Sequence, residues 1–327
     1  MSEFDLIRRF LAPLSTGHDG AFMLTDDAAL LGTSTNIIAK DTLVEGIHFT
    51  KDMPLDIIAR RALRTNLSDI AAMGAKPSAY LLSCVWPKET TEEQFSLFSR
   101  GLQQDQNEFK VSLIGGDTCV HNTESGLLTI SITALGVAPK SGAIRRSGAV
   151  IGDDVYVSGT IGDSGLGLLI MMNTESMAPD DNAFLVNRYQ LPTPRIALGG
   201  ALAGIATSAI DVSDGLLADA GRLAFSSNIG IRMSLSQVPL SSAARNWSIS
   251  QKDDTQANLK LASYGDDYEL LFTAPKPSRR AVEMAGQLTK TSVMKIGTVC
   301  RGSGVSVIGD SNEEISVPQH GYDHFTR

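Results

Sequence analysis

The chain has 327 residues, of which 43% are hydrophobic, so it is long enough to bury a full core and to form two domains. Its 36 acidic and 28 basic side chains give a formal net charge of -8, which argues against nucleic acid or an anionic membrane as a partner. The three cysteines have no CxxC spacing and no apolar run is long enough to span a membrane, so a reducing, cytoplasmic location is predicted.

The first 50 residues predict a helix followed by two strands. Apolar residues recur at helical spacing over residues 4–14, which indicates an amphipathic helix at the start of the chain. Residues 21–31 and 36–41 are typical of two short strands separated by a turn, and the second strand ends at Asp41.

The clearest element is a helix over residues 55–71, where apolar side chains follow a helical period. A second helix is predicted to begin near Thr90 or Thr91, because either threonine has Glu93 or Gln94 three residues later, the spacing of a capping box.

Alternating apolar and polar residues at 111–114 and 127–137 predict half-buried strands. The segment 139–154 is rich in glycine and has no periodicity, so we expect domains at 1–140 and 150–327. The second half alternates again, with strands predicted at 155–158, 209–212, 230–235, 268–273 and 293–299 and helices at 163–173, 195–206, 215–226 and 277–288. The fold class expected is α+β, with two mixed domains.

Aspartates recur in one local context, at the end of an apolar strand or on a helix, among small residues. Singly, each fits an ordinary turn or helix cap. Together they indicate a site, because carboxylates that converge in a buried place repel one another and bind cations. The segments are Asp26-Asp27-Ala28-Ala29, Lys40-Asp41-Thr42, Asn66-Leu67-Ser68-Asp69, Gly115-Gly116-Asp117-Thr118, Asp211-Val212-Ser213-Asp214-Gly215 and Gly265-Asp266-Asp267-Tyr268.

Magnesium is the cation that this pattern favours, because Mg²⁺ takes hard oxygen ligands and is held by single carboxylates together with substrate phosphates. The sequence has no Walker-A motif, no kinase glycine-rich loop and no GxSxG elbow, so the common ATPase and hydrolase classes are excluded. A magnesium-assisted phosphotransfer on a nucleotide is the function class that these residues indicate.

The order of these motifs resembles the thiamine-monophosphate kinase family, within the aminoimidazole-ribonucleotide-synthetase-like superfamily, over nearly the whole chain. Three runs together are specific to this family: Leu-Val-Glu-Gly-Ile-His-Phe, Asn-Leu-Ser-Asp and the terminal Gly-Tyr-Asp-His-Phe. The matching segments are Asp26–Ala29, Asp41–Phe49, Asn66–Gly74, Gly115–Thr118, Arg146–Gly148, Asp211–Leu216 and Gly321–Phe325.

The resemblance implies a reaction in which ATP phosphorylates thiamine monophosphate to thiamine diphosphate. Transfer would be direct and in line, so no covalent nucleophile is expected, and the enzyme would be a homodimer built through its N-terminal domains. By position, the magnesium ligands would be Asp27, Asp41, Asp69, Asp117, Asp211 and Asp214. The ATP contacts would be Gly116, Asp117, Arg146 and Ser213, and the thiamine phosphate contacts would be His48, Asp266 and Tyr322.

The chain departs from the family pattern at three places. Thr25 replaces the glycine that usually precedes the Asp-Asp pair, so a less tightly turned loop is expected there. Ala39 and Lys40 replace a Ser-Thr pair, so one hydroxyl that would bind magnesium is lost, while Lys40 should point away from Asp41 because side chains alternate along a strand. Asp266 replaces a glutamate, and its shorter side chain predicts a water-mediated substrate contact.

Two alternatives stay open at this point. One is another ATP-dependent enzyme of the same superfamily, although residues 1–24 contain no cysteine and the chain ends in Phe325-Thr326-Arg327 rather than in a cysteine. The other is a noncatalytic metal or nucleotide sensor, suggested by Ala39 and Lys40 at ligand positions.

Overall fold

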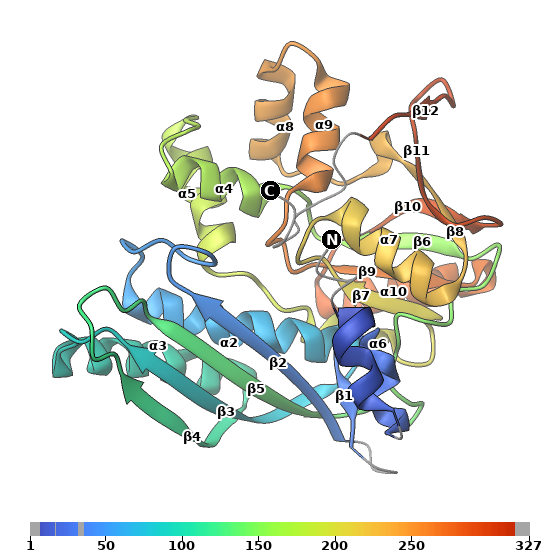
Figure 1. The fold of residues 1–327 in the computed structure, drawn as a ribbon. Helices are drawn as coiled ribbons and strands as arrows, with labels where there is room; N and C mark the ends of the chain where they lie inside the picture. Colours follow the sequence, from blue (N-terminus) through green and yellow to red (C-terminus); the bar gives the residue numbers. More distant parts are fainter. Residues whose placement is uncertain (1–6, 17, 32–35, 318–327) are drawn as a thin grey trace.

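A computed structural model describes residues 7–16, 18–31 and 36–317, and it shows two domains, each with a sheet and helices (Figure 1). The expected α+β class with two mixed domains is confirmed. Among the described helices there is none with the length and apolar character needed to cross a membrane.

The N-terminal domain contains a five-stranded sheet in the order β1-β2-β5-β3-β4. Its pairs are antiparallel except β3 with β4, which run parallel. One face of β2, β3 and β5 is buried and the other is open, which confirms for β5 the half-buried strand that its alternating pattern predicted. The strand bounds are β1 Ala29–Leu30, β2 Asn36–Val44, β3 Lys76–Trp86, β4 Ser112–Val120 and β5 Thr129–Val137.

Helices α2 (Leu55–Ala72) and α3 (Glu92–Phe109) cover the buried face of this sheet. The predicted capping box is confirmed at Thr91, whose hydroxyl accepts from the Gln94 backbone N–H while the Gln94 side chain accepts from the Thr91 N–H. The long apolar stripe of α2 is almost fully buried, which explains why this helix was the clearest prediction.

The C-terminal domain contains a seven-stranded sheet in the order β12-β11-β8-β10-β6-β9-β7, in which only β8 and β11 pair in parallel. Its strands are β6 Asp154–Ser158, β7 Ser208–Asp211, β8 Gly230–Ser234, β9 Leu270–Ala274, β10 Val293–Cys300, β11 Gly304–Ile308 and β12 Glu314–Ile315. Its helices are α4 Asp163–Met171, α5 Pro179–Gln190, α6 Ile196–Leu202, α7 Leu216–Ser227, α8 Ser242–Ser250, α9 Asp254–Ser263 and α10 Arg279–Thr289, with short 3-10 turns η4 Leu235–Gln237 and η5 Lys276–Ser278.

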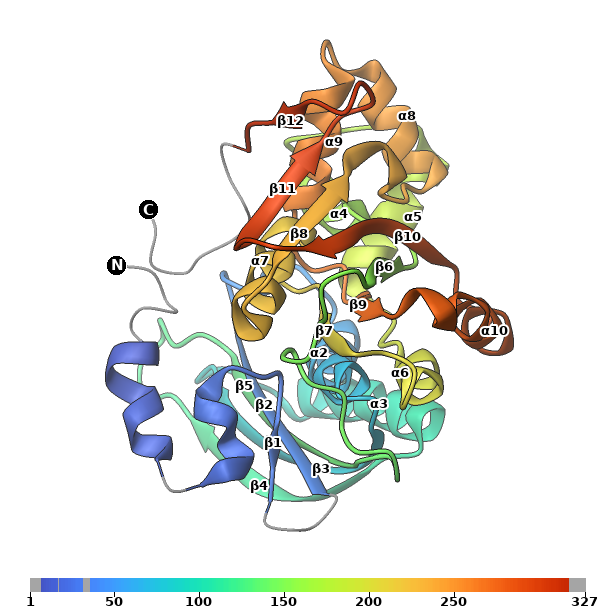
Figure 2. The same cartoon turned by 90° about the vertical axis from the view of Figure 1, so that its right-hand side faces the viewer.

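The C-terminal end of α2 joins the two domains. Figure 2 shows α2 beside α6 and β7, and a shared apolar cluster contains Ala71 and Ala72 of α2 together with Leu198 and Leu202 of α6. The helices touch so closely that a Cβ at Gly199 would lie 2.1 Å from the Ala71 carbonyl oxygen. This contact positions the last turn of α2 against the C-terminal domain.

Two predictions near the N-terminus are wrong in detail. The described part of the predicted helix over residues 4–14 forms a π-helical turn, η1 (Ile7–Leu11), and a 3-10 turn, η2 (Ala12–Ser15), and Leu14 is 81% exposed. Residues 19–24 form a 3-10 segment, η3 (Asp19–Leu24), so only Ala29–Leu30 of the predicted strand 21–31 is a strand. The helical spacing of apolar residues over 4–14 gave a wrong prediction because the described side chains among them have little hydrophobic core to pack against.

Candidate functional site

The carboxylate oxygens of Asp27, Asp69 and Asp211 lie within 4.8 Å of one another, and we call these three residues the acidic cluster. Asp27 lies in the loop before β1, Asp69 in the last turn of α2, and Asp211 at the end of β7. Three segments that are remote in the chain therefore meet where the domains join. Carboxylate oxygens at this spacing are the ligands that Mg²⁺ prefers.

Burial and mutual repulsion raise the pKa values of the cluster. The pKa of Asp69 is raised well above its usual value, first by burial and then by the charges of Asp41, Asp211 and Asp27. The pKa of Asp211 is also raised well above its usual value, by burial and by the charge of Asp27. Asp69 is further disfavoured as an anion because it lies at the negative end of the α2 dipole.

Asp41 on β2 belongs to the same electrostatic environment. Burial, followed by the charges of Asp214 and Asp27, raises its pKa to about 6. The prediction that Lys40 points away is confirmed, because its Nζ atom donates to the Ser131 hydroxyl at 2.8 Å, on the open face of the sheet. Lys40 therefore does not replace a metal ion beside Asp41.

Among the residues that the structure describes, Arg146 is the cation that contacts the acidic cluster. Its guanidinium donates twice to Asp27, at 2.9 and 2.7 Å, and its backbone N–H donates to Asp26 at 2.6 Å. Burial is the largest influence and lowers the Arg146 pKa, but Asp27, Asp211 and Asp219 together outweigh burial and raise the pKa above its usual value. One bidentate guanidinium does not neutralise three carboxylates, so the cluster keeps a negative surplus.

Ser213 and Asp214 lie in the turn between β7 and α7. Their backbone N–H groups both donate to the buried Asp219 carboxylate at 3.0 Å, and Arg222 donates to Asp214 and to Asp219 at 2.5 Å. Burial raises the pKa of Asp219 to about 7, although Arg222 works in the opposite direction. Asp219 was not among the residues predicted from the sequence, although its position in the first turn of the helix after the Asp-Val-Ser-Asp-Gly motif could have indicated it.

The predicted substrate residues His48 and Asp266 are joined by a buried arginine that was not predicted from the sequence. Arg61 of α2 donates to the His48 carbonyl oxygen at 3.2 Å and to the Asp266 carboxylate at 2.5 Å. The His48 ring accepts from the Val44 N–H through Nδ1, so the neutral ring carries its proton on Nε2. Tyr322 lies outside the described residues.

Gly116 and Asp117 lie on β4 rather than beside the acidic cluster. Asp117 pairs with Ser83 and is exposed, so it lies on the open face of the sheet, opposite to the face that carries Asp41. Gly116 has a structural reason to be glycine, because a Cβ there would meet the Leu82 carbonyl oxygen at 1.7 Å. Their roles as nucleotide contacts stay predictions.

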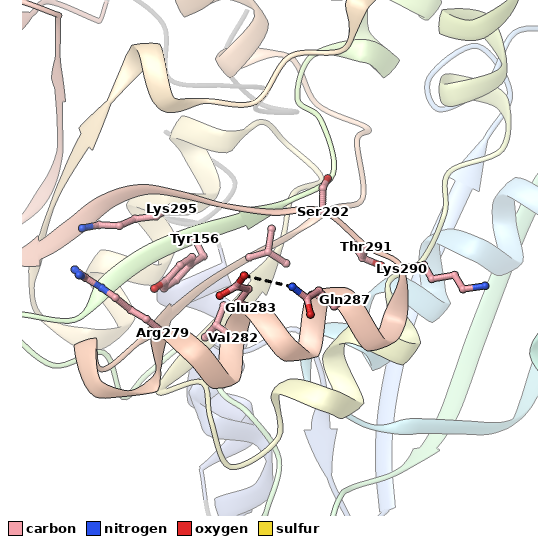
Figure 3. Close-up of a pocket in the computed structure, with 11 residues that line it drawn as sticks. Tyr156, Arg279, Val282, Glu283, Gln287, Lys290, Thr291, Ser292 and Lys295 are labelled. Carbon is pink, nitrogen blue, oxygen red and sulfur yellow. Dashed lines mark hydrogen bonds between the residues drawn. The ribbon is translucent and has the colours of Figure 1, made fainter.

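A groove on the C-terminal domain lies apart from the acidic cluster. Figure 3 shows this groove of about 690 Å³ between α10 and β10, and no predicted site residue lines it. Two of its lining residues pair with the buried Asp154, to which Arg279 donates at 2.5 and 3.0 Å and Lys295 at 2.8 Å. Asp154 is therefore fully paired with cations, in contrast to the carboxylates of the acidic cluster.

Comparison with known proteins identifies the class to which this fold and site belong. Residues 25–138 match the N-terminal domain model of the AIR synthase related proteins, and residues 150–310 match the C-terminal domain model. The protein is therefore an AIR synthase related protein, with the acidic cluster at the junction of the two matched regions.

Within that class, the chain belongs to the thiamine-monophosphate kinase family, as the resemblance predicted. It is 42% identical to the thiamine-monophosphate kinase of Caulobacter vibrioides over 93% of this chain and 86% of that protein. The Escherichia coli enzyme is 38% identical over 99% and 98% of the two chains. The solved structure of AaThiL complexed with AMPPCP and TMP has a TM-score of 0.84 at 29% identity, covering 99% of this chain and 97% of that one.

The hydrogenase maturation protein HypE of Escherichia coli has the same fold, with a TM-score of 0.73, but only 19% identity. Fold alone therefore does not distinguish between members of the superfamily. The full-length sequence similarity to thiamine-monophosphate kinases distinguishes this chain from the other members.

Proposed function

We propose that this protein transfers the γ-phosphoryl group of ATP to thiamine monophosphate, giving thiamine diphosphate and ADP. The observation that carries the proposal is the acidic cluster, which gathers three carboxylates at the domain junction with a surplus of negative charge. The relatives named thiamine-monophosphate kinase, similar along their whole length, supply the substrate class.

The donor set of the site suits magnesium. Asp27, Asp69 and Asp211 offer hard oxygen ligands, Asp41 and Asp214 lie within electrostatic reach, and the raised pKa values of Asp41, Asp69 and Asp211 show that the charged cluster is unfavourable without a cation. When bound, magnesium would neutralise the charge of the phosphate groups and hold them in line. The family motif also makes Asp117 a metal ligand, but Asp117 lies on the opposite face of the sheet, so we propose it only for an ion outside the acidic cluster.

The side chains around the cluster can orient both phosphates. Arg146 presents a planar fork that suits a phosphate as well as it suits the Asp27 carboxylate. The Nε2–H of His48 and the Asp266 carboxylate would face the thiamine phosphate. The acceptor is a phosphate oxygen that is already anionic near neutral pH, so the reaction needs positioning and charge neutralisation rather than a strong base.

We further propose a homodimer formed through the N-terminal sheet. β4 is an edge strand that is exposed along its whole length, and Ile114 and Val120 are 61% and 55% exposed. An exposed apolar edge strand favours pairing with another chain. Size-exclusion chromatography with light scattering tests this, and a monomer at micromolar concentration would contradict it.

We propose domain boundaries of 1–140 and 150–327, supported by the segment between β5 and β6, which carries no helix or strand.

A cytoplasmic location is also proposed, and the supply of ATP and the widely spaced cysteines support it.

The decisive experiment incubates the purified protein with ATP, MgCl₂ and thiamine monophosphate and measures thiamine diphosphate by chromatography. Thiamine is the matched control, because it lacks the phosphate acceptor and should give no product. Formation of thiamine diphosphate that requires Mg²⁺ is the expected result. ATP binding without any product would instead support the noncatalytic sensor.

A further inference from the structure

Arg61 is a fully buried cation on the substrate side of the domain junction. Only 1% of this residue is exposed, and its guanidinium lies 4.2 Å from the centre of the Tyr189 ring. A charge that is removed from water to this degree is costly unless several acceptors surround it. The position of those acceptors therefore indicates what the arginine does.

The three donor groups of Arg61 reach three different segments. Nε donates to the His48 carbonyl oxygen, Nη1 to the Tyr189 carbonyl oxygen in α5, and Nη2 to Asp266. The Tyr189 hydroxyl donates to the same His48 carbonyl oxygen at 3.1 Å, which closes a ring of contacts. The two residues assigned to the thiamine phosphate, which come from different domains, are thus bridged by one side chain.

The contact with Asp266 also fixes which of its oxygens can meet a ligand. Arg61 bonds to Oδ1, and the Tyr268 hydroxyl approaches the same oxygen at 3.4 Å, so Oδ2 is the oxygen available for a substrate contact within the part of the chain that the structure describes. The Asp266 side chain is 30% exposed, in contrast with the buried Arg61. Asp266 can therefore face the substrate while Arg61 supports it from behind.

The loop that carries Asp266 needs such support. Asp266 and Tyr268 have φ angles of 69° and 50°, in the left-handed region that residues other than glycine rarely adopt. Backbone bonds from Asp266 to Ser213 (2.7 Å) and from Tyr268 to Val212 (2.8 Å) hold the loop against the turn that follows the acidic cluster. Arg61 adds the side-chain contact that aims the carboxylate.

We infer that Arg61 is a positioning residue for substrate recognition: it holds His48 and Asp266 in the relative arrangement that binds thiamine monophosphate. This inference rests on the proposed function and extends it to a residue that does not touch the substrate. Loss of Arg61 should weaken binding of thiamine monophosphate and leave ATP affinity nearly unchanged.

Arg64, one turn further along α2, provides a matched control. It is also buried, at 5% exposure, and it also reaches the C-terminal domain, by donating to the Pro192 carbonyl oxygen at 3.1 Å. Its carboxylate partners, however, are Asp105 and Glu108 of α3, at 2.7 to 2.9 Å, and these lie away from the predicted substrate residues. A purely structural role at the domain junction would apply to both arginines.

The experiment compares Arg61→Met, Arg61→Lys and Arg64→Met with the wild-type protein in steady-state assays and in calorimetric titrations with thiamine monophosphate. Arg61→Met should raise KM for thiamine monophosphate about 10- to 100-fold, the range expected for lost hydrogen bonds to a charged group, and change KM for ATP by less than about twofold. Arg61→Lys combined with Asp266→Glu should recover part of the loss, because the longer acid reaches the single ammonium group.

An equal rise in both KM values for the Arg61 variants, or an equal effect of Arg64→Met, would overturn the inference. Calorimetry keeps the inference separate from the proposed function. If the wild-type protein bound thiamine monophosphate but formed no thiamine diphosphate, the kinase proposal would fail. Loss of thiamine monophosphate binding in Arg61→Lys, but not in Arg64→Met, would still support the role of Arg61. Melting temperatures of all variants establish that each one is folded.

Discussion

Two sets of buried acids in this protein have opposite electrostatic environments. Glu269 is fully buried, which by itself raises its pKa, but Arg195 and Arg188 donate to it at 2.5 to 2.9 Å and the net effect lowers the pKa. Asp69 and Asp211 are the reverse case, because burial and like charges raise their pKa values well above the usual range. Glu269 is neutralised by arginines of the protein itself. The acidic cluster is left to be neutralised by a bound cation.

The strongest test of this contrast is Asp69→Asn. The substitution removes one carboxylate from the acidic cluster, so we expect kcat to fall about 10³-fold, equivalent to roughly 4 kcal/mol of transition-state stabilisation. The metal-free protein should become more stable by about 1 kcal/mol, because a buried repulsive charge is removed. Steady-state kinetics and urea unfolding without Mg²⁺ measure the two effects. A loss of both activity and stability would show that Asp69 is a structural residue.

Glu269→Gln should have the opposite signature. It leaves the partly buried Arg188 and Arg195 with less negative charge to pair, so the free energy of unfolding should fall by about 3–5 kcal/mol. The remaining folded enzyme should keep kcat and both KM values within about twofold. Glu283→Gln on the exposed face of α10 is the control and should change stability by less than about 0.5 kcal/mol. A Glu269→Gln variant that is stable but inactive would show that Glu269 serves catalysis rather than the fold.

The pH dependence of metal-free stability tests the cluster as a whole. A carboxyl group whose pKa is higher in the folded state stabilises the protein at low pH, and this contribution is lost as pH rises through the folded value. For Asp41 that window runs from its ordinary 3.8 to about 6, and the raised values of Asp69 and Asp211 extend it upward. Metal-free protein should therefore lose stability as the pH rises through this window.

Magnesium should reverse that loss. At about pH 8 and a 100-fold excess over its Kd, Mg²⁺ should raise the melting temperature by roughly 5 °C, and at about pH 5 it should have little effect because protons compete for the carboxylates. Differential scanning fluorimetry with and without Mg²⁺ measures both values. The shift at pH 8 should be smaller in Asp69→Asn, and an equal shift in that variant would mean that magnesium binds elsewhere.

Local sequence patterns predicted the elements whose partners are near in the chain. The apolar stripe of α2 and the capping box of Thr91 follow from residue spacing alone. The acidic cluster followed from the sequence motifs. Motifs alone could not show that Asp117 lies on the opposite face of the sheet from Asp41. Arg61 was not predicted because its acceptors are as many as 205 residues away, at Asp266. Helices α5, α8 and α9 and strand β3 were also missed, since their short or mixed apolar patterns gain meaning only once packed.

The smallest expected effect concerns Ala39, where the family usually has a serine. Ala39 and Asp41 are two residues apart on β2 and so share a face, whereas Lys40 bonds to Ser131 on the other face. Ala39→Ser would place a hydroxyl on the metal side, and we expect the Mg²⁺ concentration for half-maximal activity to fall about threefold, a gain of less than 1 kcal/mol.

Lys40→Thr restores the other family residue on the open face, so it should leave the Mg²⁺ dependence unchanged. Ala39 is also 2% exposed and packs beside Ile37 and Ile70, so a serine that fails to reach a metal would be a buried, unpaired hydroxyl. An unchanged Mg²⁺ requirement with a lower melting temperature would show this outcome. The family position would then serve only core packing in this chain, and the metal would be held by carboxylates without a hydroxyl.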